Sequence, residues 1–524
     1  MERKIAHITT NAGDVASLPS TGVTCIVGSN NVGKSQLLRD IVSLLESRSI
    51  VPVVLSKVEV QGSLAHVTIE EVTDWLDKTA ERQLSPTGHS YIAMGGGQQL
   101  PAQAFVHQFQ HNDPSFLGPT RPFFCWYADA GSRVGLGGGS LGHAGMGPNP
   151  HPLARLFRDG ELEERLSDIA CTTFGFPLTL DRINGNVRLL VGEPSVPAPP
   201  MNRPTREYAE AVAALPPLES QGDGVKSFIG LALHAMVGEQ SIILIDEPEA
   251  FLHQAQAKAL GRWVASESQA RHRQVVIATH SRDIILGLLA GRAEVTVLRL
   301  TREGNDSHLR QLKAHDLTSV WDDPILRYSN VLDGLFYRSV VICEADADCR
   351  FYSAVLDYYA TITEGGVNPD EVLFVPSGGK DRIPSIARSL LSLGVETYAI
   401  ADFDVLKSKA KCKEIVEALG GDWGTADTDY ATMANALNAN SGSGWEQTKT
   451  QGLAAVPQGE ASQAATNLLS TLRTKRVLIV PVGEMEGFDR TIGSHGTEWV
   501  SGMLDRRGHE SCKEAIGLVM HISG

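Results

Sequence analysis

The stretch VTCIVGSNNVGKSQLLRDIVSLL constrains the fold of this chain more than any other, because an apolar run, a glycine loop and a helical pattern follow one another. The segment from Gly28 to Ser35 matches GxxxxGK[ST] in full, in the strand-to-helix setting that the motif requires. The motif predicts nucleotide binding, since glycines let backbone N–H groups surround phosphates at a helix N-terminus. We expect Lys34 to reach the β and γ phosphates and Ser35 to bind Mg²⁺. The alternative is a degenerate loop with a structural role.

Two further apolar runs end in polar residues that suit ATP chemistry. SIILIDEPEAFLH contains Asp246, which is placed to hold Mg²⁺ through water, and Glu247, which is placed to polarise the attacking water. QVVIATHS ends with His280 and Ser281, and the histidine could contact the γ-phosphate. Taken singly, each acid could instead serve a helix N-terminus, and the histidine could be a satisfied polar residue at a strand end. The expected ATP-binding residues are Gly28, Ser29, Asn30, Asn31, Gly33, Lys34, Ser35 and Asp246, with Glu247 and His280 as catalytic residues.

The stretch ESQGDGVKSF carries Ser220, Gly222 and Gly224 ahead of an apolar helical run. Together with the order of the other motifs, it resembles a variant of the signature loop of the ABC ATPase superfamily. The resemblance implies an ATP-bridged dimer in which Ser220 and Gly222 contact ATP on the other subunit. DEPEAFLH looks like the branch that contains Rad50, SMC and OLD (overcoming lysogenization defect) proteins. Because the gap from Ser35 to Ser220 lacks the sustained heptads of a Rad50 or SMC coiled coil, the OLD proteins are the better match.

The gap between these motifs is rich in glycine. GGGQQLPAQ near residue 95 and GSRVGLGGGSLGHAGMGPNPHP from residue 131 indicate mobile surface loops or irregular turns, although their glycines could approach a ligand. Gln98, Gln99 and Arg133 are candidate contacts on the phosphate side. Residues 151–170 have the amphipathic pattern of a helix, which could serve dimerisation, as inserted helical segments of this family often do, or core packing.

Composition limits the class of protein. At 524 residues the chain is too long for one ordinary core, so we expect two or three domains. No apolar run reaches the roughly 18 residues of a membrane span, and the first residues lack the apolar core of a secretory signal. We therefore expect a cytoplasmic protein with no membrane partner. The seven cysteines form no CxxC pair, which argues against a zinc module, and their odd number gives no disulfide framework.

The formal net charge of −15 is unfavourable for a nucleic-acid binder, because phosphate contacts normally draw on a basic surface. Any DNA site must therefore be local. Each candidate basic cluster could equally be a solvated face. The candidate residues are Lys407, Lys409, Lys411, Lys413, Arg473, Lys475, Arg476, Arg506 and Arg507.

Three apolar runs in the second half of the chain are each followed by two acids. Acids at the ends of strands in a parallel sheet should converge at one edge. Their repulsion would be costly unless a divalent cation or a raised pKa relieves it. A lone DxD would more simply be a solvated turn. The six acids are Glu344 and Asp348 after the expected strand Ser339 to Cys343, Asp402 and Asp404 in TYAIADFDVL, and Glu484 and Glu486 in TKRVLIVPVGEMEGF.

This half resembles a Toprim domain, the metal-dependent module of topoisomerases, primases and OLD-family nucleases. LFYRSVVICEADADCRFY looks like the first acidic segment of the OLD version, PSGGKDRIPSIARSLLSLG like its glycine-lysine turn and helix, and VGEMEGF like its last acidic segment. Ala345 stands where the family has glycine, and Glu484 stands where it often has aspartate. The family often places a late lysine near the metals. Lys513 is the only lysine after Glu486, but no motif ties it to the site.

The resemblance implies an α/β chain of two domains. The first is an ABC-type P-loop ATPase over 1–330, with an insertion at about 60–215. The second is a Toprim domain with a Rossmann-like parallel sheet over 331–524, with an insertion at about 414–473. The second insertion is rich in Ala, Thr, Asn, Ser and Gly, so we expect it to be partly helical and partly disordered. It could shape a DNA groove or be a spacer.

The six acids would then form one or two Mg²⁺ or Mn²⁺ sites, with Glu344 as a candidate general acid or base. The expected function is that of a DNA endonuclease in which ATP gates cleavage, a homodimer or larger, acting in antiphage defence or DNA metabolism beside a companion helicase or effector. The alternative is a regulatory ATPase scaffold that holds or releases a separate effector and uses its Toprim-like half for binding. A third class, an SMC-like DNA-organising ATPase, is disfavoured by the missing coiled coil.

Overall fold

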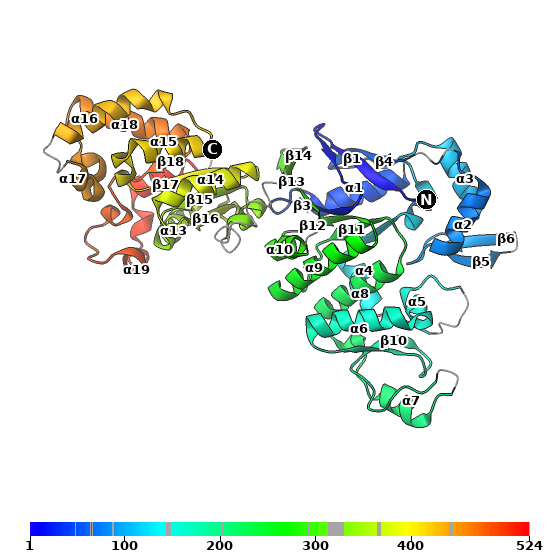
Figure 1. Cartoon of the computed structure of the whole chain (residues 1–524). Helices are drawn as coiled ribbons and strands as arrows, with labels where there is room; N and C mark the ends of the chain where they lie inside the picture. Colours follow the sequence, from blue (N-terminus) through cyan, green and yellow to red (C-terminus); the bar gives the residue numbers. More distant parts are fainter. Residues whose placement is uncertain are drawn as a thin grey trace. The chain divides into compact units, whose positions relative to one another are not determined.

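The computed structural model describes residues 1–522 except 48, 63, 65, 86–87, 143–147, 201–202, 292–293, 313–329, 364–367 and 440–443. The chain forms two compact units, Met1–Gln311 and Leu312–Gly524, and both are α/β structures built on parallel strands (Figure 1). Residues 313–329, which precede the domain boundary expected after residue 330, lie outside the described part. In the described part, no helix is long and apolar enough to cross a membrane.

A six-stranded sheet of order β14-β13-β3-β12-β11-β7 forms the centre of the first unit. The pairs β7-β11, β11-β12, β12-β3 and β3-β13 are parallel. The inner strands are continuous apolar runs because helices cover both faces of the sheet. The six strands are β3 (Gly22–Val27), β7 (Cys125–Ala128), β11 (Ile242–Asp246), β12 (Gln274–Ala278), β13 (Val295–Glu303) and β14 (Asp306–Leu312).

Alternate side chains of these strands enter two cores, one on each face of the sheet. On one face, Leu244 and Val276 belong to the core that α1 closes together with the antiparallel sheet β2-β1-β4. On the other face, Ile243 and Val275 meet residues of α8 and α9. Figure 1 shows the two helix layers on opposite sides of the strands. The covering elements are β1 (Lys4–Thr10), β2 (Val15–Ser17), β4 (Leu55–Gln61), α1 (Lys34–Glu46), α8 (Asp223–Val237), α9 (Gln254–Ala270) and α10 (Arg282–Ala290).

The insertion expected at about 60–215 is not continuous, because the central sheet takes a strand from it. β7 lies at one edge of that sheet and pairs in parallel with β11. At four residues, CWYA is too short for periodicity to mark it as a strand. The other elements of this stretch are α2 (Ile69–Thr79), β5 (Glu81–Ser85), β6 (Gly88–Ile92), α3 (Ala102–His111), α4 (Ala130–Gly137), β8 (Ser140–Leu141), α5 (Pro152–Arg158), α6 (Gly160–Phe174), β9 (Leu178–Asp181), β10 (Val187–Val191) and α7 (Arg206–Ala213).

The single helix expected over 151–170 is instead two helices, α5 and α6. They meet at Asp159, whose backbone is extended, with φ −131° and ψ 102°. Its carboxylate accepts hydrogen bonds from the N–H groups of Glu161 and Leu162. An aspartate that satisfies the free N–H groups of a following turn starts a new helix there. The prediction of one helix is therefore wrong, because amphipathic periodicity does not reveal a cap.

The glycine-rich stretch GSRVGLG begins as a helix rather than as a loop. It forms most of α4, which packs closely against α8. A Cβ at Gly230 of α8 would meet the carbonyl oxygen of Arg133, and a Cβ at Gly137 would meet that of Lys226. The glycines therefore allow two helix backbones to approach. The prediction of a mobile loop is wrong for residues 130–137, while residues 143–147 of the same stretch lie outside the described part.

A four-stranded parallel sheet of order β16-β15-β17-β18 forms the centre of the second unit. One face carries a core in which Val341, Ile400 and Leu478 join Phe351 and Trp499 from the helices α13 and α19. Helices α14 and α18 lie against the sheet as well. The elements are β15 (Ser339–Cys343), α13 (Asp346–Ile362), β16 (Val372–Pro376), α14 (Ile383–Ser392), β17 (Glu396–Ala401), α15 (Lys409–Ala418), α16 (Asp427–Ala439), α17 (Gly444–Gln451), α18 (Glu460–Thr474), β18 (Val477–Ile479), α19 (Gly496–Asp505) and α20 (Lys513–Val519).

Helices fill most of the stretch 414–473, for which partial disorder was expected. α16 and α18 pack together, and their buried residues include Met433, Leu437, Leu468 and Leu472. Alanine has the highest helix propensity of all residues, so a stretch rich in alanine with a few leucines can form a packed helical layer. The expectation of disorder is wrong for the described residues; 440–443 lie outside them.

Replacing Gly230 by alanine should destabilise the first unit by about 1–3 kcal/mol, because the new methyl group would press on the backbone of α4. Gly135→Ala is the matched control, since a Cβ there meets nothing within 4 Å. Removal of this helical glycine should be neutral or stabilise by about 0.5–1 kcal/mol. Urea unfolding of both variants tests the close packing of α4 and α8. Equal effects of the two substitutions would contradict it.

Candidate functional site

The phosphate loop connects β3 to α1 and depends on backbone conformations that favour glycine. Gly28 has a φ of 152°, Gly33 a φ of 100° and Asn31 a φ of 64°. A Cβ at Gly28 would meet the carbonyl oxygen of Leu300 on the neighbouring strand β13. The loop therefore approaches the sheet closely and ends at the N-terminus of α1, where free N–H groups and the helix dipole favour an anion.

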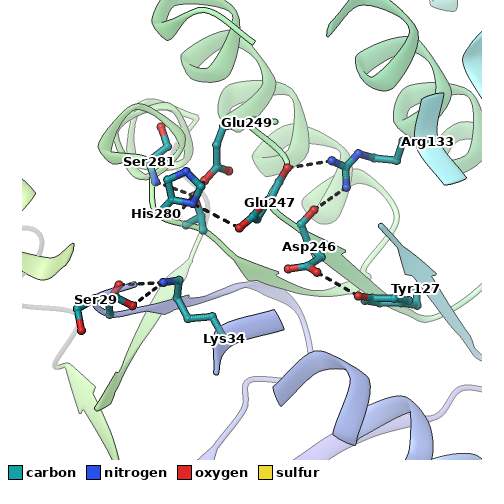
Figure 2. Close-up of polar contacts among 11 residues, drawn as sticks. Ser29, Lys34, Tyr127, Arg133, Asp246, Glu247, Glu249, His280 and Ser281 are labelled. Carbon is teal, nitrogen blue, oxygen red and sulfur yellow. Dashed lines mark hydrogen bonds and ion pairs between the residues drawn. The ribbon is translucent and has the colours of Figure 1, made fainter. Parts of the chain in front are cut away.

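Lys34 lies inside this loop (Figure 2). Its Nζ donates to the carbonyl oxygens of Gly28 at 3.0 Å and Ser29 at 2.9 Å. Burial lowers the pKa of Lys34, whereas the nearby charges of Glu247 and Asp246 act to raise it. The ammonium group is thus held beside the backbone that would surround the phosphates of a nucleotide.

Asp246 ends β11 and is suited to a magnesium ion bound with ATP. Its Oδ2 accepts a hydrogen bond from the Tyr127 hydroxyl at 3.1 Å. Burial and the charge of Asp246 raise the pKa of Tyr127 to about 12, so this donor keeps its proton. The other oxygen, Oδ1, is buried and has no hydrogen-bond partner among the described residues. A buried carboxylate oxygen needs a donor or a cation, so Asp246 fits Mg²⁺, while the role of Ser35 stays a prediction from the motif.

Glu247, Glu249 and His280 form one group beside the phosphate loop (Figure 2). Glu247 has a φ of 47°, a conformation that non-glycine residues seldom adopt, and its N–H donates to the carbonyl of Ala278. Oε1 of Glu249 accepts from the Thr279 hydroxyl at 2.8 Å and from the backbone N–H of His280 at 2.9 Å. The Nδ1 atom of His280 lies 3.6 Å from Oε1 of Glu247. The structure therefore brings together the two catalytic residues expected from sequence.

Arg133 is fully buried and holds the backbone of the acidic segment. Its guanidinium donates to the carbonyl oxygens of Ala128 and Asp246, each at 2.7 Å, and to that of Glu247 at 2.8 Å. Its Nε donates to the hydroxyl of Ser227 on α8 at 3.0 Å. Because the side chain is fully buried and its donors serve these four groups, the structure does not support the expectation that Arg133 contacts phosphate. The residue instead links α8 to the backbone that carries Glu247.

Ser220 and Gly222 lie just ahead of α8. The Ser220 hydroxyl donates to the carbonyl of Pro217, and Gly222 is the N-cap of the helix, without a side-chain cap. Their contact with ATP of a second subunit stays a prediction. Gln98 and Gln99 are exposed, and the amide of Gln99 donates to the side chain of Gln83 in the β5-β6 hairpin rather than to the phosphate loop.

In the second unit, acids that follow neighbouring strands lie together. Glu344 follows β15 and Asp402 follows β17, and the N–H of Asp402 donates to Oε1 of Glu344 at 3.2 Å. Oδ2 of Asp404 forms an ion pair with Nζ of Lys380 at 2.7 Å. Its Oδ1 is buried and has no hydrogen-bond partner among the described residues. These carboxylates therefore offer a divalent cation an unused oxygen ligand.

The remaining three acids are held by the segments around them. Oδ2 of Asp348 accepts from the N–H of Ala345 at 2.8 Å, in the first turn of α13. Oε1 of Glu486 accepts from the N–H of Gly496 at 2.8 Å. Glu484 lies 3.7 Å from Nζ of Lys449. The segment that carries both glutamates is joined to the DxD turn by a hydrogen bond from the N–H of Phe403 to the carbonyl of Gly483.

The pKa values indicate that the acids act on one another. Burial raises the pKa of Asp402 to about 9, and the charges of Glu344, Asp348, Asp404 and Glu484 add to the rise. Burial also raises the pKa of Asp348 to about 6, with a contribution from Glu486. The pKa of Glu344 rises for the same two reasons. Such mutual repulsion is typical of carboxylates that share a cation, because the cation removes its cost.

Two lysines lie beside the acids: Lys380, from the glycine-lysine turn, contacts Asp404, and Lys449 lies near Glu484. Lys513 is the first residue of α20, and no described contact joins it to the acids. Three of the lysines expected to face DNA are instead paired with acids. The pairs are Lys409 with Asp427, Lys411 with Asp381 and Lys413 with Glu417.

Comparisons with known proteins bear on the ATP site. Residues 213–286 match a family model described as "AAA domain, putative AbiEii toxin, Type IV TA system". That range includes Ser220, Asp246, Glu247 and His280. The Old nuclease of Escherichia phage P2 is 22% identical over 174 residues, which make up 32% of this chain and 28% of that protein. These two matches support an OLD-family ATPase.

Solved structures with a likeness to the chain include two SMC heads and one ABC protein. The SMC head domain from Thermotoga maritima is 16% identical, covers 60% of this chain and 100% of its own, and has a TM-score of 0.31. The Pyrococcus furiosus Smc head bound to the C-terminal domain of ScpA is 12% identical, with coverage of 61% and 99% and a TM-score of 0.34. CbiO1 from Clostridium perfringens is 11% identical, with coverage of 63% and 94% and a TM-score of 0.31. Scores of this size assign no function.

The substitution Arg133→Lys should slow ATP hydrolysis by about 10- to 100-fold. A lysine ammonium cannot reproduce the planar set of guanidinium donors that holds the carbonyl oxygens of Asp246 and Glu247. Nucleotide affinity should change little, since Arg133 contacts only protein. Steady-state kinetics and nucleotide titrations separate the two effects. Arg206→Lys, in an exposed ion pair on α7, is the control. A raised KM with an unchanged kcat would contradict the positioning role.

In metal-free protein, the raised pKa of Asp402 should make stability fall as pH rises. The folded carboxyl keeps its proton up to about pH 9, whereas the unfolded chain loses it near pH 4, so the folded state binds more protons between these values. Asp402→Asn resembles the protonated form, so it should stabilise the protein at about pH 8 and have little effect at about pH 4. Thermal unfolding in chelator at both pH values measures this.

Metal addition should reverse this difference. Mn²⁺ at about 100 times its Kd should stabilise the wild type by about 2.7 kcal/mol and should stabilise Asp402→Asn less. Asp505→Asn, an exposed change at the end of α19, is the control and should behave as the wild type at every pH. A stabilising effect of Asp402→Asn that is the same at both pH values would contradict the assignment.

Proposed function

We propose that this chain is an ATP-regulated, metal-dependent DNA endonuclease, in which the P-loop unit controls a Toprim-type nuclease in the second unit. The observation that carries the proposal is the gathering of acids after β15, β17 and β18, in a chain whose other unit has an ATP site. Structural proteins rarely bury carboxylates beside one another without a cation. The similarity to the Old nuclease of Escherichia phage P2 supports the same reading.

In the ATPase unit, the N–H groups of the phosphate loop and Lys34 bind the triphosphate. Ser35 and Asp246 would hold Mg²⁺, which supplies neutralising charge on the β and γ phosphates. Glu247 orients and polarises the attacking water. His280 lies beside Glu247, and its backbone N–H is held by Glu249, so its side chain is the candidate contact with the γ-phosphate. Ser220 and Gly222 close on ATP of a second subunit, so the functional form is a homodimer or larger.

In the second unit, the acids would hold Mg²⁺ or Mn²⁺, and the DNA phosphate would approach from solvent. Divalent ions at such a site activate water and stabilise the leaving oxygen of a phosphodiester. Lys380 fixes the orientation of Asp404 through their ion pair. Asp402 must lose its proton before it can bind metal, and Glu344 beside it can accept or donate a proton.

In this proposal, the cations closest to the acids contact the DNA. Lys380 and Lys449 lie beside Asp404 and Glu484. Arg490 donates to the carbonyl of Thr450, and both residues line a cavity together with Glu484. A local set of this kind is compatible with a net charge of −15. A role in antiphage defence, and a companion helicase or effector, rest on the family resemblance alone.

The double substitution Asp402→Ala with Asp404→Ala should abolish nicking and cutting of plasmid DNA in Mn²⁺ and Mg²⁺, while ATP hydrolysis stays measurable. Lys34→Ala should abolish ATP hydrolysis and should alter the dependence of DNA cutting on ATP. The double variant Asp505→Ala with Asp422→Ala, of equal charge change at exposed positions, is the control. DNA cleavage that survives loss of both site aspartates would remove the nuclease assignment.

The regulatory scaffold is the competing outcome of the same experiment. It predicts no cleavage under any combination of metal, nucleotide and DNA form, together with a stable complex between this chain and a second protein. In that case the acids would hold a structural cation, and the double variant would lose metal-dependent stability without losing an activity.

A further inference from the structure

A second group of metal-ligating side chains lies beyond the strand ends. Glu484, Glu486 and His495 each offer one ligand atom, and these atoms all lie within 4.8 Å of one another. The two glutamates come from the segment after β18, and His495 is the N-cap of α19. All three line a cavity of about 260 Å³ that opens to solvent. Sequence patterns did not indicate His495, because it belongs to no motif.

The backbone holds the histidine in place beside the acids. Oε1 of Glu486 accepts from the N–H of Gly496 at 2.8 Å, which ties the start of α19 to this carboxylate. The Nδ1 atom of His495 lies 3.6 Å from the same oxygen. This separation is too long for a good hydrogen bond, so Nδ1 can approach an ion shared with the two glutamates. An exposed imidazole–carboxylate ion pair alone would contribute little stability.

The chemistry of the three ligands differs from that of the other acids. Glu344, Asp402 and Asp404 offer oxygen only, which suits Mg²⁺ and Mn²⁺ alike. An imidazole nitrogen added to two carboxylates favours a first-row transition metal over Mg²⁺. We propose that Glu484, Glu486 and His495 form a site for a transition-metal ion such as Mn²⁺, next to the oxygen-only site of the proposed nuclease. This inference rests on the proposed function for its role, but its metal chemistry can be measured without cleavage.

The two groups of ligands are close enough to act on one another. The charge of Glu486 contributes to the raised pKa of Asp348, and that of Glu484 contributes to the raised pKa of Asp402. Two ions held at neighbouring groups of this kind are the arrangement that phosphodiester cleavage uses. The histidine would make the site at Glu484, Glu486 and His495 selective for Mn²⁺ over Mg²⁺. Mn²⁺ should therefore support cleavage better than Mg²⁺.

Mn²⁺ binding to the nucleotide-free full chain tests the proposal. In the wild type, pulsed electron paramagnetic resonance should show nitrogen coupling from an imidazole ligand, and His495→Ala should remove it. The same variant should weaken binding of one Mn²⁺ by at least about tenfold, the lower end of what loss of an outer-shell partner costs, and should leave Mg²⁺ binding nearly unchanged. His521→Ala, a histidine of the same unit away from the acids, is the control.

His495→Asp provides a second variant with an oxygen ligand at this position. It should restore binding of two ions while removing the nitrogen coupling and the preference for Mn²⁺. Unchanged Mn²⁺ affinity and nitrogen coupling in His495→Ala would overturn the inference even if the wild type cleaves DNA. Loss of both in His495→Ala, in a wild type that cleaves no DNA, would support the metal site and count against the nuclease assignment.

Discussion

The gathering of carboxylates at the carboxyl ends of parallel strands is the constraint on which both units depend. Parallel strands end at the same sheet edge, so acids that follow them meet whether or not they are close in sequence. In the second unit, burial together with the charges of the neighbouring acids raises the pKa of Asp402 to about 9. In the first, Asp246 keeps a buried oxygen without a described partner. A cation bound at either edge would therefore stabilise the fold, and function could be coupled to its binding.

In the first unit, buried groups behind the ATP site hold the backbone of the acidic segment that follows β11. Arg133 joins the carbonyls of Asp246 and Glu247 to α8 through Ser227, and Gly230 lets α4 approach α8 closely enough for this. α8 starts immediately after the residues expected to contact ATP of a second subunit. Movement at the start of α8 would thus reach the backbone of Glu247 through one guanidinium. The glycines of GSRVGLG serve this connection rather than flexibility.

At the edge proposed to carry the nuclease site, a group of acids lies beside a few cations. Lys380 neutralises part of the charge of Asp404, and Lys449 lies beside Glu484. A metal ion lowers the remaining repulsion, and DNA phosphate then approaches a site that is no longer strongly negative. The acidic chain as a whole opposes nucleic acid, so metal loading would be a precondition for DNA binding and not only for cleavage.

Sequence alone determined the phosphate loop, the acidic strand ends and the six acids, because each is a local pattern in which an apolar run precedes residues of defined chemistry. It did not determine that residues 151–170 break at Asp159, that alanine-rich 414–473 is helical, or that Arg133 serves the backbone. Those outcomes depend on caps, close packing and buried hydrogen bonds between segments far apart in the chain. The same holds for Lys380 and His495, which only the tertiary structure places beside the acids.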